Sequence, residues 1–160
     1  MFGTMERPNA ALVDTLLNDP ESSKYIRGVG FQWAGKGAIA SIHQRYPALK
    51  LYQTEQECGD GKNTWDAALY AWQLMQHYLN NGTSAYLYWN ISLEDGGISR
   101  WGWAQNSLVV VDADRKSYRY TPEYYIMNTS VTMCNRALSN WQPMAMQKDY
   151  WHLLIRIRVS

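Results

Sequence analysis

The feature that most limits the possible folds is an alternation of strand-like and helix-like segments along the chain. Residues 25–35, 48–57 and 84–94 are apolar and aromatic, with glycine or polar residues at their ends, which is typical of buried strands. Residues 37–47 and 64–82 lie between them, and the longer one carries apolar residues at helical spacing. Short alternating strands and helices predict a parallel sheet in an α/β fold.

Both ends of this region extend the same pattern. The opening residues 1–7 resemble the remainder of one more strand, and residues 9–18 follow as a helix of about two turns. Residues 107–113 and 117–121 predict a β-hairpin, and Pro122 starts a final helix. We therefore expect four strand–helix units followed by a hairpin.

Acidic residues follow three of the expected strands. Glu6, Glu55 and Glu94 each stand just beyond a strand end, and in parallel α/β sheets the carboxyl edge is where chemistry takes place. Glu57 is two residues from Glu55 and so points to the same side of an extended strand. The alternation of side chains therefore cannot choose between these two carboxylates.

The aromatic composition suggests a ligand class. Eight Trp and twelve Tyr stand against two Phe, and Trp and Tyr combine a flat apolar face with a polar edge. Such side chains suit a groove that stacks on sugar rings, and a tyrosine-rich core or an oligomer interface is the alternative. With 15 basic and 14 acidic residues, the chain is not expected to bind nucleic acid or an anionic membrane as its main partner.

The sequence shows no signals for a membrane span, a signal peptide, a disulfide framework or a metal cluster. No apolar run is long enough for a transmembrane helix. No signal peptide opens the sequence, which predicts a cytoplasmic chain as written. Two cysteines, Cys58 and Cys134, cannot form a disulfide framework or a metal cluster by themselves, and we expect neither a cofactor nor a metal.

Five segments together resemble the second half of glycoside hydrolase family 30, in its bacterial glucosylceramidase-like branch. They read "GTMERP", "SKYIRGVGFQWAGKGAI", "LYQTEQECGDGKN", "AYLYWNISLEDGGISRWGWAQNSLVVVD" and "PEYYIM". The resemblance implies half of a (β/α)8 TIM barrel over residues 1–127, with strands five to eight of the barrel. The hairpin 106–121 would be a remnant of the family's side β-domain. The parent family is often secreted.

The resemblance also implies site residues. It makes Glu55 the nucleophile of a retaining β-glycosidase. Glu57 is counted among the substrate-binding residues, and a carboxylate that only forms hydrogen bonds near the site is the alternative. The resemblance places Gln32 and Trp33 at the sugar hydroxyls, and Trp89 under the sugar that is cleaved. Each tryptophan could instead pack in the core. Trp101 and Trp103 would form a rim on the aglycone side. Glu94 would be either a loop acid near the aglycone or a solvated charge. The Arg7 guanidinium would either orient a carboxylate or simply be exposed.

The chain departs from the family because the segment with the family's acid/base glutamate is missing. Retaining hydrolysis needs two carboxyl groups about 5–5.5 Å apart. The expected function is therefore a weak glycosidase that depends on self-assembly, with an inactive or carbohydrate-binding remnant as the alternative. An acyl hydrolase using Cys58 or a serine lacks a G-x-S-x-G motif and a placed histidine. The sugar and the aglycone are left open.

Two hypotheses concern the chain ends. Residues 128–160 match neither the family nor a clean amphipathic pattern, and a one-base shift in the gene would restore a family-like reading, so we predict an out-of-frame tail. A genuine divergent helix and strand is the alternative. We expect the half-barrels to assemble as a homodimer or a higher homo-oligomer, and in a dimer Glu94 of one chain would act as general acid for Glu55 of the other.

Overall fold

The computed structural model describes residues 2–139, with the side chains of residues 3–132. The described chain divides into two compact units. Unit 1 contains residues 2–57 and 75–87, and unit 2 contains residues 58–74 and 88–139. The predicted boundary of the family-like region at residue 127 therefore lies inside unit 2.

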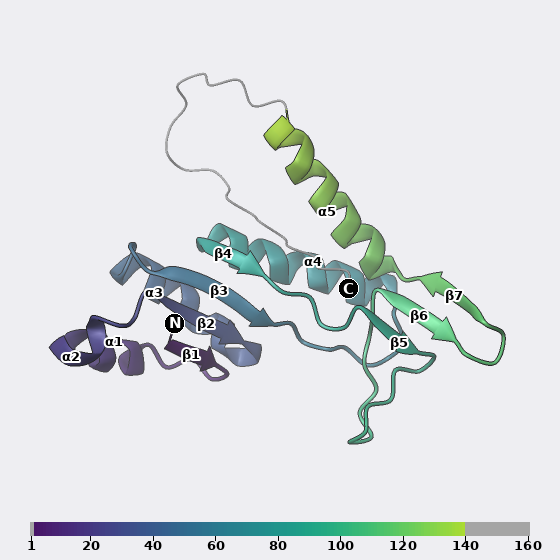
Figure 1. Ribbon diagram of the computed structural model, residues 1–160, viewed down its shortest axis with the longest axis horizontal. Coiled ribbons are helices and arrows are strands. Elements are labelled where there is room, and N and C mark those ends of the chain that lie inside the picture. The colour runs from purple at the N-terminus through teal and green to yellow at the C-terminus, as the bar shows by residue number, and fades with distance from the viewer. Residues whose placement is uncertain (1, 140–160) are drawn as a thin grey trace. The chain divides into compact units, whose positions relative to one another are not determined.

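Unit 1 is a parallel α/β sheet with its connecting helices (Figure 1). Its elements are β1 (Phe2–Met5), α1 (Ala10–Asn18), α2 (Pro20–Ser23), β2 (Gly28–Gln32), the 3-10 helix η1 (Trp33–Ala38), α3 (Ile39–Arg45), β3 (Lys50–Glu55) and β4 (Thr83–Tyr86). The helix α4 (Trp65–Asn80) begins in unit 2 and ends in unit 1. The strand order is β1-β2-β3-β4, and every neighbouring pair is parallel. The predicted alternation of four strands with helices is confirmed.

The helix ends of unit 1 follow from particular residues. The Asn9 side chain caps α1 by accepting a hydrogen bond from the amide of Leu12 at 3.2 Å, which satisfies one of the free amides of the first turn. After α4, Gly82 has a positive φ of 78°, and a Cβ atom there would lie 2.5 Å from the His43 ring. Only glycine meets both conditions without strain.

The core of unit 1 lies between the sheet and its helices. Val29 and Phe31 of β2 and Leu51 of β3 are fully buried, as are Ile39 and Ile42 of α3. Gly35 lets η1 pass close to β1, since a Cβ atom at this position would lie 1.8 Å from the carbonyl oxygen of Met5. This packing sets the start of η1 beside the carboxyl end of the sheet.

The prediction of one continuous strand over residues 84–94 is wrong, because this segment contributes to two short strands in different sheets. The ladder of β4 stops after Tyr86, where the amide of Leu87 donates to the Gln53 side-chain oxygen at 2.6 Å. A side chain of the neighbouring strand thus takes an amide that would otherwise continue the ladder. Further on, β5 (Ser92–Glu94) pairs with a strand of unit 2.

Unit 2 contains a three-stranded sheet in the order β5-β6-β7. The strands β6 (Val109–Asp112) and β7 (Ser117–Tyr120) form the expected antiparallel hairpin, while β5 adds to β6 in parallel. The turn is closed by Asp112, which accepts a hydrogen bond from the amide of Arg115 at 2.9 Å. The hairpin prediction is confirmed, and β5 was not expected.

The last described element is α5 (Pro122–Ser139). It begins with Pro122 at its first position, where the missing amide of proline costs nothing, and Thr121 accepts a hydrogen bond from the amide of Tyr124. The helix continues past residue 127, where the family resemblance stops. The rest of the predicted out-of-frame tail lies outside the described residues, so its origin stays a prediction. None of the helices in the described chain is long and apolar enough to cross a membrane.

Candidate active site

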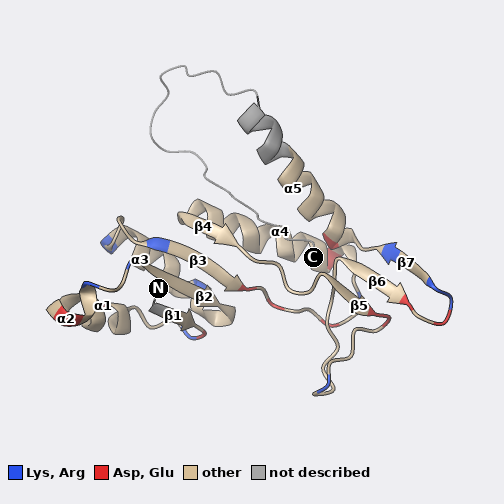
Figure 2. Cartoon of the chain, viewed as in Figure 1, with Lys and Arg blue, Asp and Glu red and all other residues tan. Residues whose placement is uncertain are grey.

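Glu55 is the last residue of β3 and stands at the carboxyl end of the parallel sheet, where Figure 2 shows acidic residues in red. Leu51 and Gln53, at the same parity along the strand, are fully buried, while Glu55 is half-buried. Gln32, the last residue of β2, is its partner across the ladder. The strand therefore anchors Glu55 on a rigid core and leaves its carboxylate accessible at the edge where parallel sheets place their sites.

Trp33 makes a direct contact with this carboxylate. Its indole Nε1–H donates a hydrogen bond to Oε1 of Glu55 at 2.9 Å. Trp33 has a φ of 45°, in a region that bulky residues rarely adopt and that costs about 1–3 kcal/mol. Because the surrounding structure keeps this backbone conformation, the contact between the indole and the carboxylate is built into the fold.

A bulge between β2 and β3 contributes to this geometry. Phe31 pairs with Gln53 and Gln32 pairs with Glu55, so Thr54 has no partner in the ladder. The Thr54 hydroxyl donates to the carbonyl oxygen of Phe31 at 3.0 Å. Bulges bend a strand and change the direction of the following side chains, so this one sets the direction of Glu55.

Glu57 lies two residues after β3 and forms an ion pair with Lys36 of η1. The Lys36 ammonium group also donates to the carbonyl oxygen of Trp33 at 3.3 Å. The alternative interpretation of Glu57, as a carboxylate that forms hydrogen bonds near Glu55, fits this geometry. Gln32, Trp33, Glu55 and Glu57 are therefore brought together in unit 1.

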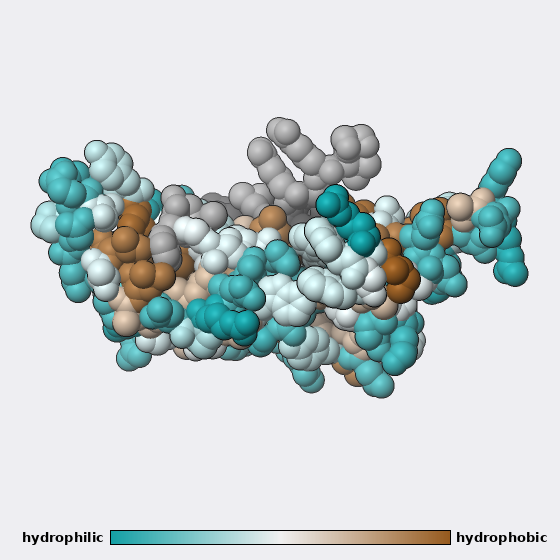
Figure 3. Space-filling view, turned by 90° about the horizontal axis from the view of Figure 1, so that it is seen from below, coloured by the Kyte–Doolittle hydropathy of each residue, from teal (hydrophilic) through white to brown (hydrophobic). Residues whose placement is uncertain are grey.

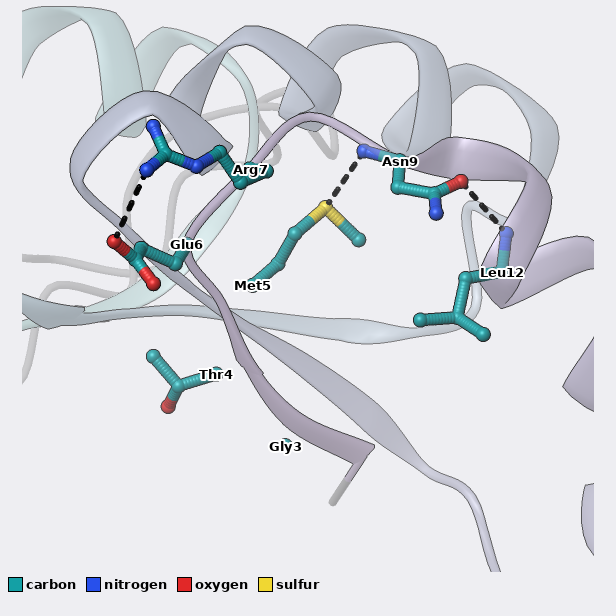
Figure 4. A pocket seen from close by; sticks show the side chains of 7 residues that line it. All are labelled: Gly3, Thr4, Met5, Glu6, Arg7, Asn9 and Leu12. Atoms are coloured by element: carbon teal, nitrogen blue, oxygen red, sulfur yellow. Dashed lines mark hydrogen bonds and ion pairs between the residues drawn. The ribbon is translucent and has the colours of Figure 1, made fainter.

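A shallow pocket lies at the carboxyl end of β1 (Figure 4). Its lining consists of Gly3, Thr4, Met5, Glu6, Arg7, Asn9 and Leu12. Glu6 pairs with Arg7 at 3.8 Å, and both side chains are exposed. An exposed pair of this kind contributes little to stability, and Arg7 is thus engaged with the acid next to it in the chain.

The remaining predicted site residues belong to unit 2. Glu94 is exposed at the end of β5, so the expectation that it follows the last strand of the parallel sheet is wrong. Trp89 stands three residues after β4 rather than at its end, and its side chain is 39% exposed. The strand break after Tyr86 explains both corrections.

Trp101 and Trp103 form an exposed aromatic pair on the loop before β6. Their side chains are 66% and 62% exposed, and their ring centroids are 6.2 Å apart. The Ser99 hydroxyl accepts hydrogen bonds from both backbone amides, and the Arg100 guanidinium lies over the Trp101 ring at 5.1 Å. Beyond these two residues, Figure 3 shows hydrophobic residues in brown among the hydrophilic ones on the face in view. Within the described chain, neither tryptophan packs in the core.

Asn106 is a buried polar residue that the sequence reasoning missed. Its side-chain oxygen accepts hydrogen bonds from the amides of Gly61 and Asn63, and its side-chain nitrogen donates to Glu123. Its own carbonyl oxygen accepts a hydrogen bond from Asn90, next to Trp89. The residue stands between Gln105 and Ser107 in the run "AQNS", and no local pattern distinguishes it from a solvated loop residue.

Glu123 is 3% exposed, and burial raises the pKa of its carboxyl above 4.5, although hydrogen bonds from Tyr88 and Asn106 oppose the shift. Between 4.5 and the raised pKa the folded chain binds more protons than the unfolded chain, so the free energy of unfolding falls as the pH rises.

We expect Glu123→Gln to remove this pH dependence, because glutamine keeps an oxygen acceptor and cannot ionise. The variant should be more stable than the parent protein at pH 8, by about 1.4 kcal/mol for each unit of the pKa shift, and equally stable below pH 4.5. Urea unfolding at both pH values measures the difference. Equal stability of the two proteins at pH 8 would contradict an ionised Glu123 that is held in the folded core.

The described residues contain no group of histidine, cysteine and acidic side chains that could hold a metal ion. A half-buried carboxylate that is oriented by an indole N–H and fixed on a strand end can act as a nucleophile or as a general base.

Unit 1 thus has a parallel α/β fold with a half-buried carboxylate at the carboxyl end of its sheet, and comparisons with known proteins specify the kind of fold. The chain is 24% identical over 126 residues to the Caenorhabditis elegans protein named "Putative glucosylceramidase 3", covering 71% of the chain and 24% of that protein. It is 24% identical over 129 residues to the lysosomal acid glucosylceramidase of Mus musculus, covering 70% and 24%. The chain thus spans about a quarter of the length of these relatives. No family model matches it.

Solved structures agree on the fold. SrfJ from Salmonella typhimurium has a TM-score of 0.63 at 22% identity, over 78% of this chain and 29% of that chain. An endo-β1,6-glucanase has a TM-score of 0.58 at 21% identity, over 71% and 27%. The chain is therefore similar, over part of its length and at low identity, to glucosylceramidases, as the resemblance to family 30 predicts, and it shares the fold of part of these structures.

Proposed function

We propose that the chain is the nucleophile-bearing part of a retaining β-glycoside hydrolase with Glu55 as its nucleophile. The observation that carries this proposal is the hydrogen bond from Trp33 to the half-buried Glu55 carboxylate at the carboxyl end of β3. The distant similarity to glucosylceramidases supports a β-glycoside as the substrate class.

In this mechanism Glu55 attacks the anomeric carbon of the sugar and displaces the aglycone, which gives a covalent glycosyl-enzyme. Water then releases the sugar with its original anomeric configuration. The Trp33 indole holds one carboxylate oxygen and leaves the other available for attack. A second carboxyl group must protonate the leaving oxygen, and losing such acid assistance costs a factor of about 10² to 10⁴.

A panel of 4-nitrophenyl β-glycosides of glucose, galactose, fucose and xylose tests the proposal. The nitrophenolate leaving group needs little protonation, so the chain should turn over at least one of these substrates even without its acid. Proton NMR of the first product should show the β-anomer. No turnover of any substrate, or release of the α-anomer, would contradict a retaining β-glycosidase.

A carbohydrate-binding protein without turnover is the second candidate, and the exposed Trp101–Trp103 pair favours it. Two neighbouring indoles can stack on successive sugar rings of a glucan. Titration calorimetry with a β-glucan oligosaccharide, together with no hydrolysis of the aryl glycosides, would support this function over the first. Loss of the binding heat in the double variant Trp101→Ala, Trp103→Ala would locate it.

We further propose that the chain works as a homodimer. Within the described chain, β1 and β4 each pair with one strand only, and open strand edges favour pairing with another chain. One chain has a mass of 18.5 kDa. Size-exclusion chromatography with light scattering at micromolar concentration should give twice this mass. A monodisperse monomer would refute this assembly.

Glu94 stays our candidate for the general acid, supplied by the second chain of such a dimer. Its carboxylate is exposed and is not part of the parallel sheet. On a β-glycoside whose leaving alcohol needs protonation, Glu55→Gln and Glu94→Gln should each be inactive. Mixing the two variants under conditions of subunit exchange should then restore one working site per heterodimer. No recovery after proven exchange would mean that Glu94 does not act across the interface.

A further inference from the structure

Lys36 occupies a central position among the residues around Glu55, and neither the sequence nor the resemblance assigns it a role. Its ammonium group forms the ion pair with Glu57, in the segment after β3, and donates to the backbone carbonyl of Trp33. One side chain therefore connects the two segments that carry the nucleophile and its indole partner. The ammonium is partly buried, with 32% of the Lys36 side chain exposed and 22% of that of Glu57.

The backbone of η1 is fixed from a second side at the same residue. The carbonyl oxygen of Lys36 lies 3.1 Å from Nε2 of His77, which stands on α4. The backbone of Lys36 is thus held by α4, while its side chain holds Glu57. This double attachment gives Lys36 little freedom to move away from the carboxyl end of β3.

The contacts of the Lys36 ammonium with Glu57 and Trp33 matter because the Trp33 backbone is in a strained conformation. A residue keeps a φ of 45° only when its surroundings hold it there. The hydrogen bond from the Lys36 ammonium to the Trp33 carbonyl oxygen is one of the contacts that can do so. The ion pair with Glu57 draws the segment that follows Glu55 toward the same ammonium. A partly buried ion pair with additional hydrogen bonds can hold geometry even where its net energy is small.

We propose that the Lys36–Glu57 ion pair positions Trp33 so that its indole N–H holds the Glu55 carboxylate in the orientation for attack. Lys36 and Glu57 are positioning residues in this proposal, because they act through Trp33 and Glu55. The effect on turnover depends on the proposed glycosidase function. The effect on the indole does not depend on that function and can be measured separately.

The direct measurement is the Trp33 indole Nε1–H resonance in a ¹H–¹⁵N spectrum of the intact chain. Its assignment comes from its absence in Trp33→Phe, and Glu55→Gln marks the position without a carboxylate acceptor. Lys36→Met should move the resonance toward the Glu55→Gln position, because the indole then leaves the carboxylate. Lys36→Arg keeps the charge and should leave the resonance near its parent position.

The exchanged pair Lys36→Glu with Glu57→Lys provides the rescue. Each single change should displace the indole resonance. The double variant should restore it in part, because the opposite charges face each other again, although a glutamate at position 36 cannot donate to the Trp33 carbonyl oxygen. A merely structural role for Lys36 would not give recovery that depends on charge order. Lys24→Met, which removes an exposed ammonium that pairs with Glu21, is the matched control and should change nothing at Trp33.

Kinetics form the second part of the test. On the aryl glycoside that the chain hydrolyses best, Lys36→Met should lower kcat by about 10-fold to 100-fold, as small misplacements of reacting groups do, while KM changes little. An unchanged indole resonance in Lys36→Met, or no recovery in the exchanged pair, would overturn the proposal. If the indole responds as expected but Glu55→Gln keeps full turnover, the positioning holds and the proposed glycosidase function fails.

Discussion

Glu55→Gln is expected to lower the turnover of the best aryl β-glycoside by at least about 10³-fold while leaving the fold intact. Glutamine has nearly the shape of glutamate and keeps an oxygen that can accept the Trp33 hydrogen bond, but it cannot form the glycosyl-enzyme. The carboxylate is half-buried at a strand end, so its loss should change the free energy of unfolding by only about 0.5 kcal/mol. Initial rates and thermal unfolding of the same preparation measure both effects.

Two further variants make this result specific to one carboxylate. Glu57→Gln, two residues along the chain, should retain measurable turnover, because Glu57 is paired with Lys36 and acts through other residues. In Glu55→Ala, added azide should restore cleavage and give the α-glycosyl azide, since the small anion attacks from the face that the carboxylate has left. If Glu57→Gln abolished turnover and Glu55→Gln did not, the nucleophile would be Glu57.

The strands and helices of unit 1 were predictable because local patterns and tertiary structure agree there. The apolar segments around β2 and β3 are bounded by glycine and polar residues, and α4 shows helical spacing. The strand break after Tyr86 was not predictable. It depends on a hydrogen bond from the Leu87 amide to Gln53, 34 residues earlier in the chain, and the segment 84–94 alone has the pattern of one strand.

The position of Glu55 at the carboxyl edge also followed from the sequence, but its surroundings did not. The contact with Trp33 needs a left-handed backbone at a bulky residue and a bulge at Thr54, and both run against local preference. The Lys36–Glu57 pair joins residues that are 21 positions apart. Side chains that meet only after the sheet has formed leave no periodic signal in a single sequence.

Buried polar residues were the hardest to foresee, and Asn106 is the clearest case. Asparagine is usually exposed, and its neighbours in the sequence are typical of a loop. In the folded chain it is 1% exposed and is hydrogen-bonded to Gly61, Asn63 and Glu123. A polar side chain can be buried at low cost only when its partners are in place, so its burial depends on the whole of the surrounding loop structure.

Asn106→Ala should therefore be the most destabilising single polar substitution in unit 2. It removes the acceptor for two backbone amides and the donor to Glu123, and unsatisfied buried polar groups cost about 1–3 kcal/mol each. Because the loop can relax toward water, we expect a total of about 3 kcal/mol and a fall in Tm of about 6 to 10 °C. Thermal unfolding followed by near-ultraviolet circular dichroism measures it.

The control for this experiment is Asn128→Ala on α5, where the asparagine is exposed. Alanine favours the helix and removes no buried hydrogen bond, so Tm should stay the same or rise slightly. Asn106→Asp separates the two sides of the buried side chain, because it keeps the acceptor for Gly61 and Asn63 but places a second carboxyl against Glu123. Its destabilisation should decrease at low pH, where these acids are protonated. A pH-independent loss in Asn106→Asp, or a fall in Tm in Asn128→Ala as large as in Asn106→Ala, would show that the hydrogen bonds of Asn106 do not hold unit 2 together.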